Sequence, residues 1–172
     1  MFRNILVTLD GTEPSNNALK HASSVAALSG ARLILTHVLL RGAPVAALSD
    51  LAAANGFADK VKDDLDDVEV LPVAAMGAAG VVETVSDDLL EKFAFLLLDK
   101  AASAAHAQGV AETESRQLDD DPATAILDCA KSENLDLIVT GSRGFGDVKS
   151  LLLGSVFHKL VENAECPFVV VK

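Results

Sequence analysis

The sequence predicts an α/β fold in which a single doubly wound sheet of five parallel strands carries helices on both faces. Apolar runs of strand length recur along the chain and alternate with segments whose apolar residues follow helical spacing. Strands that are apolar on both faces and are joined through helices are typical of parallel sheets. Right-handed crossovers make this a doubly wound sheet with a crevice where the winding reverses, and we expect the strand order 3-2-1-4-5. At 172 residues, the chain fits one domain, 1–172, with an excursion at about 41–85.

The first strand, helix and second strand follow directly from local signals. Ile5–Leu9 is an apolar run that ends at Asp10. Pro14 suits a first helical turn, where its missing N–H costs nothing, and Gly30 is a natural C-terminal stop. The run 33–40 predicts the second strand.

Residues 41–85 give conflicting signals and predict a departure from the sheet. The segment is rich in glycine and proline and contains a cluster of aspartates. Within it, residues 46–54 fit a short helix and 68–73 a short strand.

Beyond residue 85 the alternation returns. The pattern predicts a helix from Ser86 to about Gln108, and then an edge strand at 110–118, because that segment carries too many charges for a central strand. Asp121 and Pro122 form a helix start, and the helix that follows places Cys129 in the core. The last three elements are a strand at 135–140, a helix at 152–164 and a strand at 168–171. The last helix is expected to face inward with Leu153, Val156, Phe157, Leu160 and Val161.

Net charge and cysteine content exclude some classes of function and favour one cellular compartment. The formal net charge is -11, which argues against nucleic-acid binding and against an anionic membrane surface, since both need a basic face. Cys129 and Cys166 lack a disulfide or metal spacing and fit a reducing compartment. The N-terminus lacks the apolar core of a signal peptide, and no apolar stretch is long enough to span a bilayer. We therefore expect a cytoplasmic protein without membrane insertion.

A glycine loop after the fourth strand carries the clearest chemical signal. The segment TGSRGFG at 140–146 begins with Thr140, and LGSV follows at 153–156. Gly141 and Gly144 allow the backbone to turn sharply and approach a ligand. Gly154 and Ser155 fall in the first turn of the last helix, where unpaired N–H groups and the helix dipole favour an anion. The two clusters belong to the end of one strand and the helix that it feeds, so they predict a phosphate site, with Arg143 and Lys149 as compensating charges.

The same glycine pattern, together with both ends of the chain, resembles the universal stress protein family. Gly141, Gly144, Gly154 and Ser155 are spaced as in that family, the run LLLGSVFHKLVENAECPFVVVK is similar to its C-terminal ending, and NILVTLDGTEPSNNAL is similar to its opening. The resemblance covers roughly 1–40 and 86–172 and implies an adenine nucleotide alpha hydrolase-like fold. The excursion at 41–85 is longer than the family's usual connection, so it could cover the pocket, reshape it or bind a protein partner.

The resemblance also implies an ATP or AMP site. Asp10 is expected near the ribose and Val38 near the adenine. The remaining expected contacts divide between the base pocket (Thr8, Leu9), the ribose and phosphate (Gly141, Arg143, Gly144) and the outer phosphates (Gly154, Ser155, Val156), and Thr140 is expected to belong to the same site. A Mg²⁺ ion accompanying ATP is expected to be held mainly by the phosphates. Pairing of the closing strand 168–171 across a two-fold axis, and so a homodimer, is implied as well.

Binding without fast turnover is the leading hypothesis. The chain has no P-loop signature and no nucleophile and base that spacing brings together, so no catalytic residue and no metal ligand is assigned. The four histidines are scattered, although His37 stands beside the proposed adenine position. We therefore expect an adenine-nucleotide-binding regulatory protein of the stress response. The alternatives are a slow ATPase or adenylate-handling enzyme and a nucleotide-free protein-interaction module.

Overall fold

The structure is a computed structural model, which describes every residue except 40, 42–43, 63, 65–67, 73–80 and 143–154. Helices and strands alternate along most of the chain. The elements are β1 (Asn4–Thr8), α1 (Glu13–Ser29), β2 (Arg32–Val38), α2 (Val45–Ala54), α3 (Ala58–Val61), β3 (Val68–Pro72), β4 (Val81–Val85), α4 (Asp87–Ala107), β5 (Thr113–Leu118), α5 (Pro122–Ser132), β6 (Leu137–Gly141), α6 (Ser155–Asn163) and β7 (Phe168–Val171).

The chain divides into two compact units. One consists of Met1–Val38 together with Leu97–Lys172, and the other of Leu39–Leu96. Helix α4 therefore begins in the second unit and ends in the first. The candidate site belongs to the first unit.

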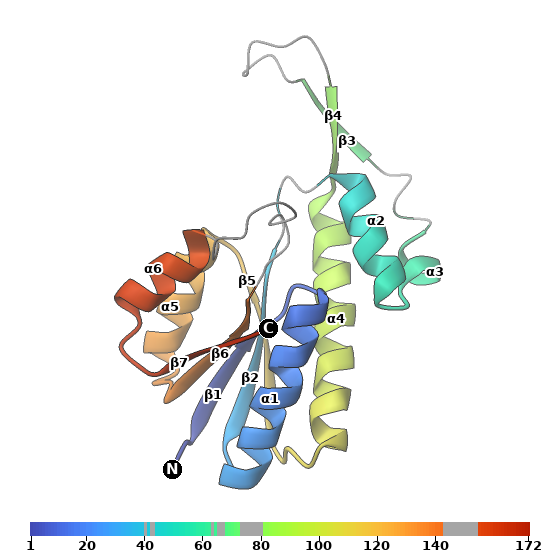
Figure 1. Cartoon of the computed structure of the whole chain (residues 1–172). Helices are drawn as coiled ribbons and strands as arrows, with labels where there is room; N and C mark the ends of the chain where they lie inside the picture. Colours follow the sequence, from blue (N-terminus) through green and yellow to red (C-terminus); the bar gives the residue numbers. More distant parts are fainter. Residues whose placement is uncertain (40, 42–43, 63, 65–67, 73–80, 143–154) are drawn as a thin grey trace. The chain divides into compact units, whose positions relative to one another are not determined.

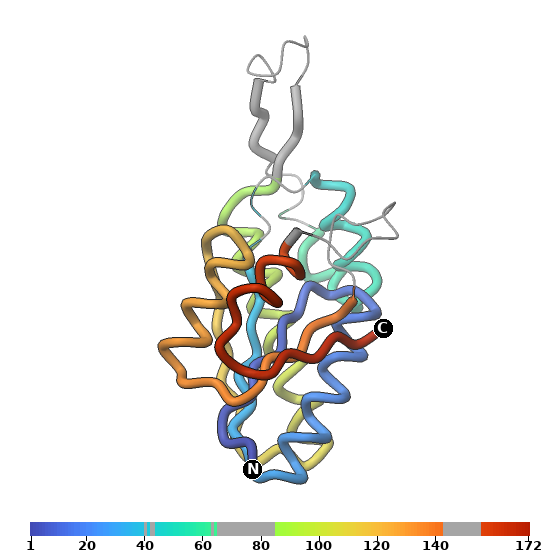
Figure 2. The backbone as a smooth tube through the Cα atoms, turned by 60° about the vertical axis from the view of Figure 1, so that its left-hand side comes forward, coloured from blue at the N-terminus to red at the C-terminus, as the bar shows by residue number. Residues whose placement is uncertain are grey.

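A five-stranded sheet forms the centre of the first unit. Its order is β5-β2-β1-β6-β7, and every neighbouring pair is parallel (Figure 1). Numbered by sequence among these five strands, this is the predicted order 3-2-1-4-5, which is confirmed. The charged strand β5 lies at one edge, as its alternating sequence predicted, and β7 lies at the other beside β6 (Figure 1, Figure 2).

Helices cover both faces of this sheet. Leu6, Ile34 and Ile138 form the centre of one face, on which α5 and α6 pack through Ile126 and Leu160. Helix α1 and the C-terminal half of α4 lie on the opposite face (Figure 1). The strands that carry the site are therefore held from both sides.

The predicted helix ends are confirmed at α1 and α5. Helix α1 has Pro14 in its first turn and ends at Gly30, whose φ of 68° is left-handed. The side chain of Asp121 accepts a hydrogen bond from the Thr124 amide at 3.3 Å and so caps α5. Cys129 on this helix is 8% exposed and belongs to the core, as expected.

The prediction for the last helix is partly wrong. Leu160 is buried and Val156 is half-buried, but Val161 is 52% exposed. Positions 156 and 160 lie one turn apart on the face toward α5, and the next residue is rotated by about 100° away from it. Phe157 is half-buried against the ring of Phe168, whereas Leu153 lies outside the described residues.

The second unit holds the excursion. It contains α2, α3, the first part of α4 and an antiparallel pair, β3 and β4, which forms a separate two-stranded sheet. The rings of Phe57 and Phe93 meet edge to face with centroids 6.1 Å apart. An ion pair joins Arg41 to Asp87 within this unit. Helix α2 and strand β3 confirm the helix predicted at 46–54 and the strand predicted at 68–73.

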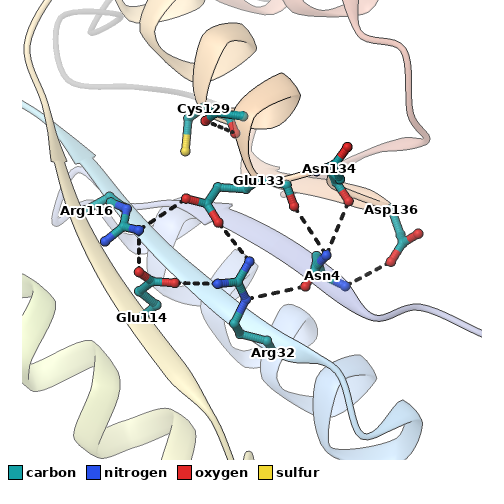
Figure 3. Close-up of polar contacts among 9 residues, drawn as sticks. Asn4, Arg32, Glu114, Arg116, Cys129, Glu133, Asn134 and Asp136 are labelled. Carbon is teal, nitrogen blue, oxygen red and sulfur yellow. Dashed lines mark hydrogen bonds and ion pairs between the residues drawn. The ribbon is translucent and has the colours of Figure 1, made fainter.

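Ion pairs and hydrogen bonds connect the residues at the amino ends of β1 and β2 (Figure 3). Arg32 at the start of β2 donates to Glu114 of β5 at 2.6 Å and to Glu133 at the end of α5 at 2.8 Å. Arg116 of β5 pairs with the same two carboxylates. The Asn4 side chain donates to the Glu133 carbonyl and accepts from Arg32. This amino-edge network connects β1, β2, β5 and the end of α5 at the edge opposite the candidate site.

A search of the described part of the chain finds no helix whose length and apolar character would let it cross a membrane.

Candidate functional site

The candidate site lies at the carboxyl edge of the five-stranded sheet, where β1, β2 and β6 end. Strand β1 pairs with β2 on one side and with β6 on the other. The chain winds from β1 outward to β2 and β5, and then returns to β6 on the opposite side of β1. The switch point between β1 and β6 is the position at which ligands bind in open α/β sheets.

Two threonines connect β1 and β6 at this edge. The hydroxyl oxygens of Thr8 and Thr140 are 2.7 Å apart, a hydrogen-bonding distance. Both residues were expected to belong to the site, Thr8 from the family resemblance and Thr140 as the first residue of the glycine loop. The structure brings them into direct contact, so a polar pair marks the edge of the sheet at the switch point.

Asp10 organises the turn from β1 into α1. One oxygen of its carboxylate accepts hydrogen bonds from the Thr12 amide at 2.9 Å and the Thr12 hydroxyl at 2.6 Å. Gly11 between them has a φ of 83°, which an L residue adopts at a cost. Thr12 then precedes the first turn of α1. The predicted ribose-side carboxylate is therefore fixed in direction by its own turn.

Gly141 at the end of β6 lies against the start of α1. A Cβ atom at this position would be 2.8 Å from the carbonyl carbon of Pro14 and 2.8 Å from the amide nitrogen of Ser15. Both neighbours are backbone atoms, so neither can yield by rotating a side chain. The sequence predicted that this glycine lets the backbone approach a ligand. The structure gives it a second role, close packing of a strand end against a helix.

Ser15 is a polar residue of this edge that the sequence analysis did not identify. It is 3% exposed, and its hydroxyl donates to the Thr12 carbonyl at 3.0 Å. The amide of Asp10 donates to the same hydroxyl at 3.4 Å. A serine three residues after a threonine at a helix start is a local signal that could have identified it.

His37 and Val38 end β2 beside this turn. His37 is 2% exposed, and its Nδ1 lies 2.7 Å from the carbonyl oxygen of Leu9. Burial lowers the pKa of His37, while the hydrogen bond to Leu9 and the charge of Asp10 act in the opposite direction. Val38, predicted near the adenine, is half-buried and packs against the core cluster around Ile34.

Leu9 is buried and borders a pocket of about 200 Å³ between α1 and the C-terminal half of α4. Leu19, Leu97 and Ala101 form much of its apolar wall, with Lys20 and Lys100 among the residues that line it. The site residue Leu9 therefore faces a hollow on the α1 side of the sheet.

The predicted phosphate loop is only partly within the described residues. Arg143, Gly144, Lys149 and Gly154 lie outside them. Ser155 begins α6, and Val156 packs against the core cluster on the α5 side. Among the described residues, no group of three or more His, Cys, Asp or Glu side chains is arranged to hold a metal ion.

The chain is similar to known proteins over its whole length. The family model described as "Universal stress protein family" matches residues 1–172. A universal stress protein from Thermus aquaticus is 33% identical over 172 residues, covering 100% of both chains. The universal stress protein YxiE of Bacillus subtilis is 28% identical over 176 residues, which cover 100% of both.

Solved structures agree in fold. A universal stress protein crystallised in complex with cAMP has a TM-score of 0.63 at 21% identity, over 99% of this chain and 97% of that one. A universal stress protein from Archaeoglobus fulgidus in complex with dAMP has a TM-score of 0.62 at 20% identity, over 99% of this chain and 98% of that one.

Proposed function

Because the chain belongs to the universal stress protein family, we propose that it is an adenine-nucleotide-binding regulatory protein of the stress response that acts without fast catalysis. The ligand is ATP or AMP, held at the carboxyl edge described above. The observation that carries the proposal is the convergence of Thr8, Asp10, Thr140 and Gly141 at the switch point of the sheet. Two structures of similar fold were solved with adenine nucleotides, cAMP and dAMP.

The geometry suits a ribose and phosphates more than a reacting centre. Threonine hydroxyls and a fixed carboxylate are hydrogen-bonding partners for ribose hydroxyls. The proposed phosphate contacts are Arg143, Gly144, Gly154, Ser155 and Val156. A Mg²⁺ ion, if bound with ATP, would be coordinated mainly by phosphate oxygens.

The test is calorimetric titration of the purified protein with ATP, AMP and GTP, with and without Mg²⁺. We expect the adenine nucleotides to bind more tightly than GTP. Phosphate release above the buffer rate in the same samples would favour the slow-ATPase alternative. Absence of adenine-nucleotide binding at millimolar concentration would refute the proposal.

A matched pair of variants locates the site. Asp10→Ala is expected to weaken adenine-nucleotide binding by about tenfold or more, since it removes a charged hydrogen-bonding group. Asp136→Ala is the control, because Asp136 also accepts two hydrogen bonds, from the amides of Arg3 and Asn4, but at the opposite edge of the sheet. Equal effects of the two variants would place the nucleotide elsewhere.

We also propose that two copies pair through β7. This strand forms an edge of the sheet, its sequence is apolar, and Val169 is 43% exposed. Apolar edge strands are usually covered or paired. Light scattering at micromolar concentration is expected to give a dimer that Val169→Lys converts to a monomer. Val161→Lys, which changes an exposed valine on α6, is the control and is expected to remain dimeric.

A further inference from the structure

Buried polar side chains gather around one peptide group of the candidate site, the peptide between Leu9 and Asp10. Among the described residues, the buried polar or charged ones are Ser15, Ser23, Thr36, His37 and Asn55. Two of them contact this peptide. The ring of His37 lies 2.7 Å from its carbonyl oxygen, and the hydroxyl of Ser15 accepts from its N–H at 3.4 Å.

The peptide lies just beyond the regular pairing of β1 with β2. The paired register ends at Thr8 and Thr36. The Leu9 amide still donates to the Thr36 carbonyl at 2.8 Å. The carbonyl oxygen of Leu9 then contacts the side chain of His37, which belongs to β2. This is the point at which the chain leaves the sheet and presents Asp10.

The chemistry of the contact fixes the tautomer of His37. A carbonyl oxygen only accepts, so the Nδ1 atom must carry the proton that forms this hydrogen bond. The ring is buried, and burial lowers its pKa despite the contributions from the Leu9 carbonyl and the Asp10 carboxylate. At neutral pH the ring is therefore the neutral Nδ1–H form.

We infer that His37 is a positioning residue of the nucleotide site, which by donating from Nδ1 to the Leu9 carbonyl holds the Leu9–Asp10 peptide in the orientation that binding requires. The inference rests on the proposed function. His37 acts through the peptide that precedes Asp10. The assignment explains why a costly buried imidazole stands where β2 ends.

Thr36 offers a matched control. It is 1% exposed, and its hydroxyl donates to the Val7 carbonyl at 3.0 Å. Thr36→Val and His37→Leu therefore each remove a buried side-chain hydrogen bond made from β2, to Val7 of β1 in the first case and to Leu9, just beyond β1, in the second. Only His37→Leu releases the peptide next to Asp10. His37→Asn supplies an amide N–H close to the position of Nδ1–H and serves as the conservative variant.

The experiment measures ATP affinity by calorimetry for the wild type and these variants, with urea denaturation to record stability. We expect His37→Leu to bind about tenfold or more weakly, while Thr36→Val and His37→Asn stay within about threefold of the wild type. Wild-type binding that His37→Leu leaves unchanged would refute the inference alone. Equal losses in His37→Leu and Thr36→Val would also refute it, because they would reveal a purely structural role. No binding by the wild type would refute the proposed function and the inference with it.

A second measurement does not depend on the variants folding. Nitrogen-15 NMR of the wild-type protein distinguishes the two neutral tautomers of His37. An Nδ1–H signal that shifts when ATP is added supports the inference. An Nε2–H tautomer, or a signal insensitive to ATP, overturns it.

Discussion

The two edges of the five-stranded parallel sheet differ in the groups that pair with their polar side chains. At the amino edge, full charges neutralise one another: Arg32 and Arg116 lie between Glu114 and Glu133 (Figure 3). At the carboxyl edge, the described contacts are made by hydroxyls, one turn-forming carboxylate, a neutral imidazole and backbone. At the amino edge, the arginine and glutamate side chains pair with one another. At the carboxyl edge, hydrogen bonds hold the polar groups in fixed directions at the switch point between β1 and β6. We therefore expect substitutions at the amino edge to change mainly the free energy of unfolding, and substitutions at the carboxyl edge to change nucleotide binding as well.

The largest expected effect comes from Gly141→Ala. The new Cβ would meet backbone atoms of Pro14 and Ser15 at 2.8 Å, so the strand end or the helix start must shift. Overpacking of this kind destabilises by about 1–3 kcal/mol. We expect that loss in urea denaturation together with loss of adenine-nucleotide binding in calorimetry.

The control for Gly141→Ala is Gly30→Ala. Gly30 has a left-handed φ of 68°, but a Cβ there meets nothing within 4 Å. The backbone strain is expected to cost about 1–2 kcal/mol and to leave nucleotide affinity unchanged. If Gly141→Ala bound nucleotide as the wild type does, close packing at the carboxyl edge would not be part of the site.

Gly141 also illustrates what the sequence could predict. The sheet and the edge position of β5 followed from local apolar runs and charge patterns, and the predicted ends at Leu9 and Thr140 lie one residue from the observed ends of β1 and β6. The contact of Gly141 with Pro14 did not follow from such patterns, because it depends on a distance between segments far apart in the chain. The spacing of glycines is visible in a sequence, but the atoms that a missing Cβ would meet are not.

The excursion was predicted less completely for a related reason. A strand at 68–73 was predicted from its own composition, and β3 occupies Val68–Pro72, but the partner β4 was not predicted. An antiparallel pair is defined by the register between its strands, such as Val68 opposite Val85, and glycine and alanine between them obscured that pattern. Binding of a protein partner by this segment stays a prediction, as does the single-domain organisation of 1–172.

The next prediction separates the two edges by pH. Hydrogen bonds from Arg116 and Arg32 lower the pKa of Glu133, so its contribution to stability is present above the ordinary glutamate pKa of about 4.3 and is lost as pH falls through the lowered value. Burial lowers the pKa of His37. The contribution of neutral His37 to stability is therefore present above the ordinary histidine pKa of about 6.5. It is lost as the pH falls from that value through the lowered pKa of His37 in the folded protein. The carboxyl edge should therefore weaken first on acidification.

Urea midpoints measured from pH 8 to pH 3 test this order. Glu133→Gln is expected to lower the midpoint at neutral pH, by less than Gly141→Ala does, and to converge with the wild type at the acid end. His37→Asn is expected to flatten the profile between about pH 6.5 and the onset of the Glu133 step. Nucleotide affinity should be unchanged in Glu133→Gln, because the amino-edge network is remote from the site. A binding defect in that variant would contradict the division between the edges.

The smallest expected effect concerns the threonine pair, and it tests whether the carboxyl edge is bonded to itself or open to a ligand. The hydroxyls of Thr8 and Thr140 lie 2.7 Å apart and are partly buried. A double-mutant cycle of Thr8→Val and Thr140→Val should give a coupling free energy of about 0.5–1.5 kcal/mol without nucleotide. Saturating ATP should change this coupling, because a ligand that engages either hydroxyl competes with the pair. A coupling that nucleotide leaves unaltered would mean that the threonines only join β1 to β6, as the charges join the strands at the opposite edge.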